Sequence, residues 1–189
     1  MPFTPFHLGV GVAAKSLAPR LISLQVFALS QVAMDIEPGV LMARGADELH
    51  GWTHTLPGAV PVALACVIVW KILEGRRIWR WTFEPIRAAM LWTTVFVGVW
   101  SHVALDSLIH RDMASTRHLL ALDGYGLLPH ESVELACLAM AAIGGAVVAI
   151  RLGAQGVSDS FRALIRNLQQ SPGKFERAAS RTDQPGPTD

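Results

Sequence analysis

Long uncharged stretches constrain the fold of this chain more than any other feature of its sequence. Residues 56–70 and 88–105 carry no formal charge, and neither do residues 135–150 around a Gly144–Gly145 pair. A helix needs about 20 mostly apolar residues to cross a bilayer, or about 17 at the shortest. Counted with their flanks, the runs at 52–70, 88–105 and 132–150 predict three membrane-spanning helices, of which the third is the weakest because it contains Glu134.

Two shorter apolar runs, residues 6–14 and 21–34, come before these three. They predict two short helices, which could form a hairpin around Pro19 instead of two full crossings. We expect the second to end at Asp35 and Glu37, stopped by Pro38. The predicted fold class is all-α, a polytopic membrane helical bundle of about five helices whose first two are short.

The polar C-terminal part sets a boundary between two predicted domains. We expect a membrane-embedded domain over residues 1–151 and a cytoplasmic part over 152–189. Within the second part, residues 158–168 place apolar side chains on one face and arginines on the other, which indicates an amphipathic helix, either on the membrane surface or solvated. The residues from Gln170 onward are rich in Ser, Pro and Gly and predict a disordered tail.

The low charge content bears on which binding partners are expected. Only 16% of the residues are charged and the formal net charge is +1, whereas soluble proteins average roughly 25% charged residues. Such a weak field does not attract polyanions, so we expect a lipid bilayer and no nucleic acid as partner. Cys66 and Cys137 each lie inside an apolar run and are expected to be buried thiols. The oligomeric state is left open.

Basic residues orient the predicted helices. If the five helices alternate across the membrane, one set of connections, with the C-terminal part, holds thirteen of the sixteen Lys and Arg residues. The other set, which includes the N-terminus, holds only Arg44, Arg111 and Arg117. Because cytoplasmic loops carry an excess of Lys and Arg, we expect the N-terminus outside and the C-terminus in the cytoplasm.

Histidines and acids gather on the outward side of that topology. All seven histidines lie in or within two turns of an outward-facing segment, and nine of the fifteen acids lie there too. His118 is expected to be an interfacial residue. The candidate metal ligands are His7, His50, His54, His102, Asp106, His110, His130 and Glu134, with Asp35 and Glu37 as candidate catalytic acids.

Four-residue spacing strengthens the prediction of a metal site, because residues four apart on a helix share one face. His102, Asp106 and His110 form one stripe, and the pairs His50–His54 and His130–Glu134 repeat the spacing. His102 and His110 are roughly 12 Å apart along a helix, so one ion does not easily bind both.

Asp106 could therefore bridge two ions, or it could pair with a single histidine and hold two helices together. Asp35 and Glu37 have an alternative role as headgroup anchors at a helix end. The sequence His50-Gly51-Trp52-Thr53-His54 is superficially like a zincin helix, but Gly51 occupies the place of its catalytic glutamate, which excludes that mechanism.

Four ordered blocks resemble the YdjM-like family of bacterial inner-membrane proteins. They are the opening Met-Pro-Phe-Thr-Pro-Phe-His-Leu-Gly, the Asp35-Ile36-Glu37-Pro38 step, His50 to Ala59, and Ser101 to Met113. The resemblance covers roughly residues 1–150. It implies a multi-pass protein of the bacterial inner membrane with metal-dependent hydrolase activity.

A second, fainter likeness is to zinc-dependent phospholipases C, whose helical site uses HxxxD, a later histidine and then HxxxE. His102 to Asp106, His110, and His130 to Glu134 follow that order here, although the gap before His110 is shorter and the N-terminal tryptophan ligand is missing. This likeness implies a phosphoester substrate.

The predicted function is a membrane-bound metal-dependent hydrolase with its site at the outer membrane–water interface. We expect a phosphoester or another small or lipid-linked substrate, and one or two divalent ions. Imidazole and carboxylate ligands without thiolate suit zinc, manganese or iron. Asp35 or Glu37 is expected as general base. The alternative is a membrane metal transporter or sensor, although such proteins place their ligands near the midplane of the bilayer.

Overall fold

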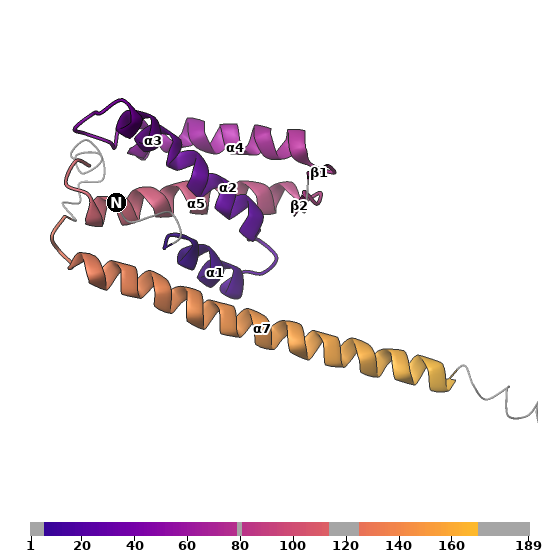
Figure 1. Cartoon of the computed structure of the whole chain (residues 1–189). Helices are drawn as coiled ribbons and strands as arrows, with labels where there is room; N and C mark the ends of the chain where they lie inside the picture. The colour runs from indigo at the N-terminus through magenta and orange to yellow at the C-terminus, as the bar shows by residue number, and fades with distance from the viewer. Residues whose placement is uncertain (1–5, 79–80, 114–124, 170–189) are drawn as a thin grey trace, which may run out of the picture. The chain divides into compact units, whose positions relative to one another are not determined.

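The computed structural model describes residues 6–78, 81–113 and 125–169 (Figure 1). The chain divides into two compact units, Met1–Val147 and Val148–Asp189. The described part of the chain is mostly helical, as predicted. Residues 170–189, for which a disordered tail is expected, and His118 lie outside the described residues.

The described elements are six helices, one 3₁₀ turn and two short strands. The helices are α1 (Leu8–Leu17), α2 (Leu24–Met34), α3 (Ile36–Ala43), α4 (Ala59–Leu73), α5 (Ala88–Ile109) and α7 (His130–Gln169). A 3₁₀ turn, η1, covers Trp52–His54, and strands β1 (Arg77–Ile78) and β2 (Trp81–Thr82) form a small antiparallel pair that the sequence analysis did not predict.

Three helical stretches are long and apolar enough to cross a membrane: Leu24–Ala43, Ala88–Ile109 and His130–Ala163. The chain therefore has the helices of a membrane protein, as expected. The predicted spans at 88–105 and 132–150 lie within two of them. The remaining predicted span, 52–70, is replaced by η1 and the 15-residue helix α4.

A turn at Thr55 separates η1 from α4. The Thr55 hydroxyl donates to the Trp52 carbonyl and accepts from the Gly58 N–H. A side chain at Gly58 would meet the Trp52 carbonyl oxygen, because a Cβ there would lie 1.8 Å from it. The helix therefore starts at Ala59, and the predicted start near Trp52 was wrong.

Helix α2 ends at Met34, next to Asp35 as expected, but Pro38 does not stop the helical path of the chain, because α3 follows directly. Asp35 alone separates α2 from α3, and its N–H donates to the Gln31 carbonyl while its carbonyl accepts from the Gly39 N–H. Pro38 is the third residue of α3. A proline is tolerated in the first turn of a helix, where its missing N–H has no intrahelical acceptor.

Helix α7 is a single element of 40 residues. At 1.5 Å per residue it is about 60 Å long, roughly twice the hydrocarbon thickness of a bilayer. The amphipathic segment expected at 158–168 is the C-terminal part of this helix and not a separate element.

The core of the first unit lies between α2, α4 and α5, and α5 packs against both others. Apolar side chains from all three helices are buried there: Val26, Met34, Ala63, Cys66, Trp70, Leu91, Val95, Val99 and Val103. Cys66 and Cys137 are buried and free of disulfide bonds, which confirms their prediction as core thiols.

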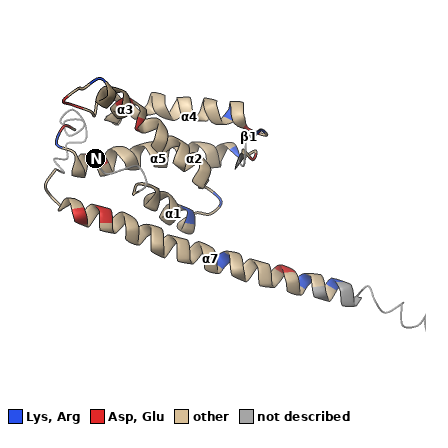
Figure 2. Cartoon of the chain, viewed as in Figure 1, with Lys and Arg blue, Asp and Glu red and all other residues tan. Residues whose placement is uncertain are grey.

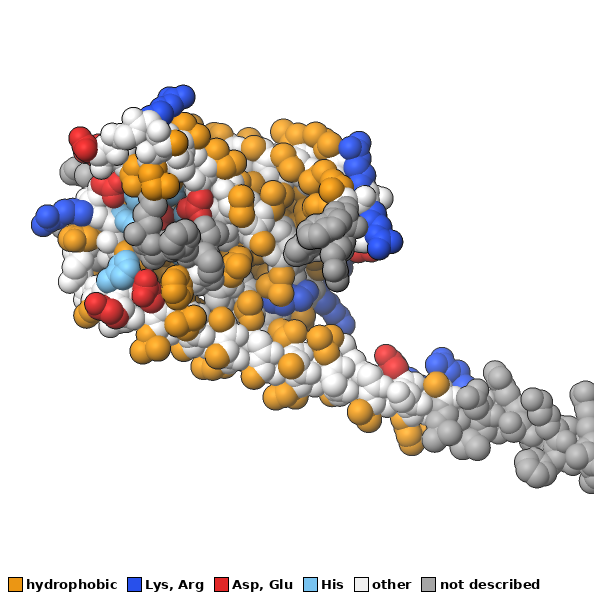
Figure 3. Space-filling model, viewed as in Figure 1, with side chains coloured by type: hydrophobic (Ala, Val, Ile, Leu, Met, Phe, Trp, Pro, Cys, Tyr) orange, Lys and Arg blue, Asp and Glu red, His pale blue; other side chains and the backbone are white. Residues whose placement is uncertain are grey.

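Charged side chains separate between the two ends of this unit (Figures 2 and 3). Acids and histidines gather where α3 lies and α7 begins, and most Lys and Arg side chains of the unit lie at the opposite end, near β1. There Lys71 bonds Glu74 at 2.7 Å, and this hydrogen bond lowers the pKa of the Glu74 carboxyl.

Close packing of α1 on the first half of α7 depends on Gly9, and Gly9→Ala should destabilise the protein. A Cβ at Gly9 would lie 2.0 Å from the Cys137 carbonyl oxygen, a backbone atom that cannot rotate away. Overpacking of this kind costs about 1–3 kcal/mol. Thermal unfolding in detergent should show a lower Tm for Gly9→Ala than for the control Gly145→Ala, whose Cβ would meet nothing within 4 Å. Equal Tm values would contradict the packing described.

Candidate metal centre

Seven metal-ligating side chains from separate parts of the chain meet at one end of the first unit. His7 precedes α1, Asp35 joins α2 to α3, and His50 and His54 belong to the segment around η1. His102 and Asp106 lie in α5, and His110 follows it. Five of the seven are more than nine-tenths buried: His7, His50, His54, His102 and Asp106. All seven were singled out in the sequence, Asp35 as a candidate catalytic carboxylate and the other six as candidate metal ligands.

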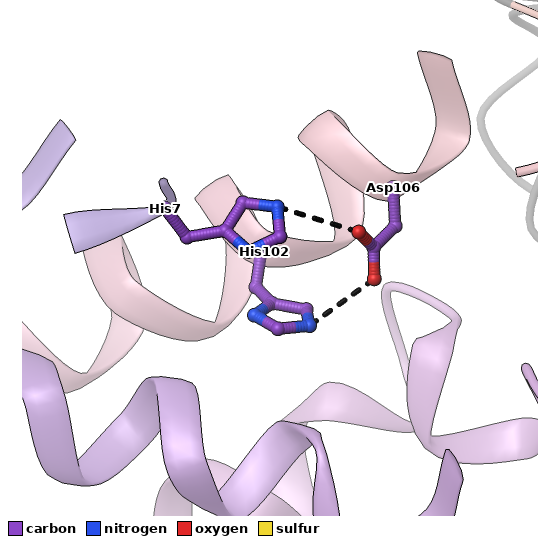
Figure 4. A group of neighbouring side chains, drawn as sticks. All are labelled: His7, His102 and Asp106. Carbon is purple, nitrogen blue, oxygen red and sulfur yellow. Dashed lines mark ion pairs between the residues drawn. The ribbon is translucent and has the colours of Figure 1, made fainter. Parts of the chain in front are cut away.

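Asp106 is at the centre of this cluster. Its Oδ1 lies 3.4 Å from Nε2 of His7 and 3.9 Å from Nε2 of His110. Its Oδ2 lies 3.1 Å, 3.5 Å and 3.7 Å from the Nε2 atoms of His102, His54 and His50. Figure 4 shows the ring of His7 directed at one carboxylate oxygen and the ring of His102 directed at the other. A single carboxylate thus faces five imidazoles.

Three groups in the described part of the chain bring their ligand atoms within 4.8 Å of one another. They are His7, His102 and Asp106; Asp35, His54 and His102; and His50, Asp106 and His110. The groups share His102 and Asp106, so they form one continuous cluster. These buried groups could hold a metal ion.

Gln31 fixes the tautomer of His102. The Gln31 amide nitrogen donates to the Gly98 carbonyl at 3.0 Å, so its oxygen faces Nδ1 of His102, also at 3.0 Å. An amide oxygen only accepts, so Nδ1 carries the proton and Nε2 of the neutral ring holds a lone pair. That Nε2 faces two carboxylate oxygens, those of Asp106 at 3.1 Å and Asp35 at 3.4 Å.

Asp112 fixes His50 in the same way. Both Asp112 oxygens lie 2.9 Å from Nδ1 of His50, and Oδ2 also accepts from the backbone N–H groups of Leu49 and His50. Burial opposes the charge of this carboxylate, but these hydrogen bonds outweigh burial and lower the pKa of Asp112 to about 2. An ionised carboxylate only accepts, so Nδ1 of His50 donates and its Nε2 lone pair faces Asp106.

Glu37 fixes His54 through Thr53. The Thr53 N–H and hydroxyl both donate to Oε2 of Glu37. The hydroxyl has one proton, so it accepts from Nδ1 of His54 at 3.2 Å. Burial lowers the pKa of His54 to about 3 in spite of the nearby Asp106 charge, so its ring is neutral at pH 7. Its Nε2 lone pair also faces Asp106.

The absence of a side chain at Gly51 leaves space for Glu37, which fixes His54 through Thr53. A Cβ at Gly51 would lie 2.5 Å from Oε1 of Glu37. The position that lacks the zincin glutamate in sequence is thus next to a glutamate supplied by α3.

In these neutral tautomers, the Nε2 lone pairs of His50, His54 and His102 face the Asp106 carboxylate, and nitrogen and oxygen lone pairs repel each other. A divalent ion or a proton on a ring relieves this repulsion. Nε2 of His102 is buried and has no hydrogen-bond partner, although Asp106 lies 3.1 Å away.

The distances are also compatible with metal coordination. Two ligands 2.0–2.1 Å from one tetrahedral ion lie about 3.3 Å apart. The N···O separations of 3.1–3.9 Å around Asp106 surround this value. Charge-assisted N–H···O bonds are typically shorter, at about 2.7–2.9 Å. The donor set and its spacing thus fit a divalent ion.

Two predicted ligands lie apart from these groups. His130 and Glu134 pair with each other at 3.1 Å on the first turns of α7, and their side chains are 44% and 30% exposed. Neither belongs to the three groups found among the described residues. Glu37, predicted as a general base, accepts hydrogen bonds from Thr53, whereas Asp35 is among the ligand groups.

Sequence reasoning missed the residues that orient the histidines, Gln31, Thr53 and Asp112. Gln31 carried a usable signal, because it is the one amide in residues 26–34 and precedes Asp35 by four residues. Asp112 carried no such signal, because it is separated from His50 by 62 residues.

No family model, curated protein or solved structure matches the chain.

Proposed function

We propose that this protein is a metal-dependent hydrolase of the membrane–water interface. The observation that carries the proposal is the set of three histidines, each with Nδ1 bound to an acceptor and Nε2 directed at Asp106. Acceptors behind ligating histidines are typical of metal sites and fix the orientation of the ring. Zinc is the ion that we expect, because it takes imidazole and carboxylate ligands.

Access from one side favours an enzyme over a transporter. The Asp35 side chain is 38% exposed and that of His110 is 18% exposed, whereas the other ligands are almost inaccessible. All three ligand groups belong to one end of the first unit, and the described residues contain no second group at the other end. A transporter needs ligands that both sides of the membrane can reach.

The residues of the chain divide the chemistry between them. A bound divalent ion acts as a Lewis acid and makes water a nucleophile near neutral pH. Asp35, the most exposed carboxylate of the cluster, is placed to accept the proton of that water. Gln31, Asp112 and the Glu37–Thr53 pair hold the three histidines in their ligating tautomer.

The length of α4 supports a substrate that resides in the membrane. Its 15 residues extend about 22 Å, less than the hydrocarbon thickness of about 30 Å. If α4 crosses the bilayer, the segment with His50 and His54 lies at or inside the headgroup layer. The phosphoester of a lipid headgroup reaches that depth, which favours a phosphoester or other lipid-linked substrate.

Purified protein should hydrolyse a phosphodiester in a metal-dependent reaction. The test is release of nitrophenolate from bis(4-nitrophenyl) phosphate in detergent, with Zn²⁺ or Mn²⁺ added. His102→Ala should lower the rate at least about 100-fold, because it removes a proposed metal ligand together with the ring that Gln31 orients. The control His130→Ala should keep the rate. Metal binding without hydrolysis, combined with Zn²⁺ uptake by proteoliposomes, would favour the transporter.

The centre should face outward across the bacterial inner membrane, with the C-terminus in the cytoplasm. The reason is that thirteen of sixteen basic residues lie on the other set of connections. Alkaline phosphatase, which is active only outside, should give high activity when fused after Gly124 and low activity when fused after Arg80 or Asp189. High activity after Arg80 would reverse the orientation.

A further inference from the structure

The seven clustered ligands contain two sets that share no residue. One set is Asp35, His54 and His102, and the other is His50, Asp106 and His110. Each set has one carboxylate and two imidazoles, with all ligand atoms within 4.8 Å. Three protein ligands and an open position are the usual content of a catalytic zinc site. Each set is therefore sufficient for one ion.

A single ion does not reach both sets. Ligand atoms bound to the same ion at about 2.1 Å are at most about 4.2 Å apart. Among the described residues, no group of ligand atoms within 4.8 Å of one another contains both His102 and His110. Asp106 lies between them, four residues from each.

The two oxygens of Asp106 connect the sets. Oδ2 is 3.1 Å from Nε2 of His102 and 3.5 Å from Nε2 of His54, both in the first set. In the second set, Nε2 of His110 lies 3.9 Å from Oδ1 and Nε2 of His50 lies 3.7 Å from Oδ2, so Asp106 contacts the histidines of both sets. Two-metal hydrolases hold their ions about 3.5–4 Å apart, a separation that the two oxygens of one carboxylate can span.

The charges of the site also match two ions. Four carboxylates contact the histidines of the cluster: Asp35, Glu37, Asp106 and Asp112. Two divalent ions match the charge of four carboxylates. The burial of Asp106 makes an unbalanced charge on this central carboxylate costly.

We propose that the centre is dinuclear, with Asp106 bridging one ion bound by Asp35, His54 and His102 and a second bound by His50 and His110. This inference rests on the proposed metal-dependent function but adds the number of ions and the division of the ligands between them. It assigns the two ends of the stripe on α5 to different ions.

Zinc stoichiometry tests the proposal independently of hydrolysis. The full chain, purified in detergent through a tag without histidine, is equilibrated with excess Zn²⁺, desalted and analysed for zinc per protein. Wild type should bind two ions. Asp35→Asn and His110→Ala should each bind one, because each removes a ligand from a different set. Asp106→Asn should bind fewer than either, and the control His130→Ala should bind two.

Several outcomes would overturn the dinuclear assignment. Wild type with one ion would refute it while leaving the metal centre in place. Two ions retained in His110→Ala would show that the second set is not a site. No zinc in wild type would refute the proposed function as well. The double variant Asp35→Asn/His110→Ala adds a second comparison. It should bind no zinc if each set holds its own ion. If both sets share a single ion, each single variant should already lose that ion.

Discussion

Asp106→Asn is expected to abolish high-affinity metal binding while the helices remain folded. The substitution keeps the size of the side chain but replaces the anionic oxygens that face five histidines at 3.1–3.9 Å. Loss of a residue that only orients a ligand typically costs 10–100-fold in metal affinity. Loss of the central carboxylate should cost more, so zinc affinity is expected to fall by more than about 100-fold.

Asp47→Asn is the matched control, because it makes the same change at an exposed position of the same unit. It should leave the zinc content of the purified protein unaltered, and circular dichroism should show the same helix content in both variants. If Asp106 serves only to join helices, Asp106→Asn removes a buried charge and is neutral or stabilising. Full zinc occupancy in Asp106→Asn would refute the centre described here.

Removal of the metal should lower the thermal stability of wild type by a large amount. An ion that binds only the folded state stabilises it by about 4 kcal/mol when its free concentration is a thousand times Kd. For a chain of this size, that corresponds to a Tm shift of roughly 8–16 °C. Without the ion, the lone pairs of His50, His54 and His102 face the carboxylate directly, which adds repulsion.

Tryptophan fluorescence during heating in detergent measures this shift. Wild type with Zn²⁺ should melt at a higher temperature than wild type with a chelator, and added Zn²⁺ should restore the Tm. Asp106→Asn should have the same Tm in both conditions. A chelator effect of equal size in wild type and Asp106→Asn would locate the metal elsewhere.

The sequence predicted the helical class and most of the clustered residues, because both depend on local patterns. The uncharged run at 88–105 predicted α5, and four-residue spacing placed His102, Asp106 and His110 on one stripe. Spacing along one helix does not predict whether its stripe lies next to ligands from other helices. The pair His130–Glu134 has the required spacing, yet its two side chains bond each other on an exposed part of α7.

The sequence reasoning missed two local turns and two contacts between distant residues. The start of α4 depends on the turn at Thr55 and the close approach of Gly58 to Trp52. The path of the chain through Pro38 depends on where the first turn of α3 falls, which a proline alone does not indicate. Asp112 bonds His50 across 62 residues and Gln31 bonds His102 across 71, so no window of sequence contains either pair.

The order of the clustered residues along the chain has a consequence for biogenesis. His7, Asp35, His50 and His54 are synthesised first, but His102, Asp106 and His110 belong to α5 or follow it directly. A nascent chain that ends before α5 therefore has histidines without the carboxylate that unites them. If the centre binds an ion, more than half of the protein must be synthesised before its full set of ligands exists. Metal loading is then expected to follow the synthesis of α5.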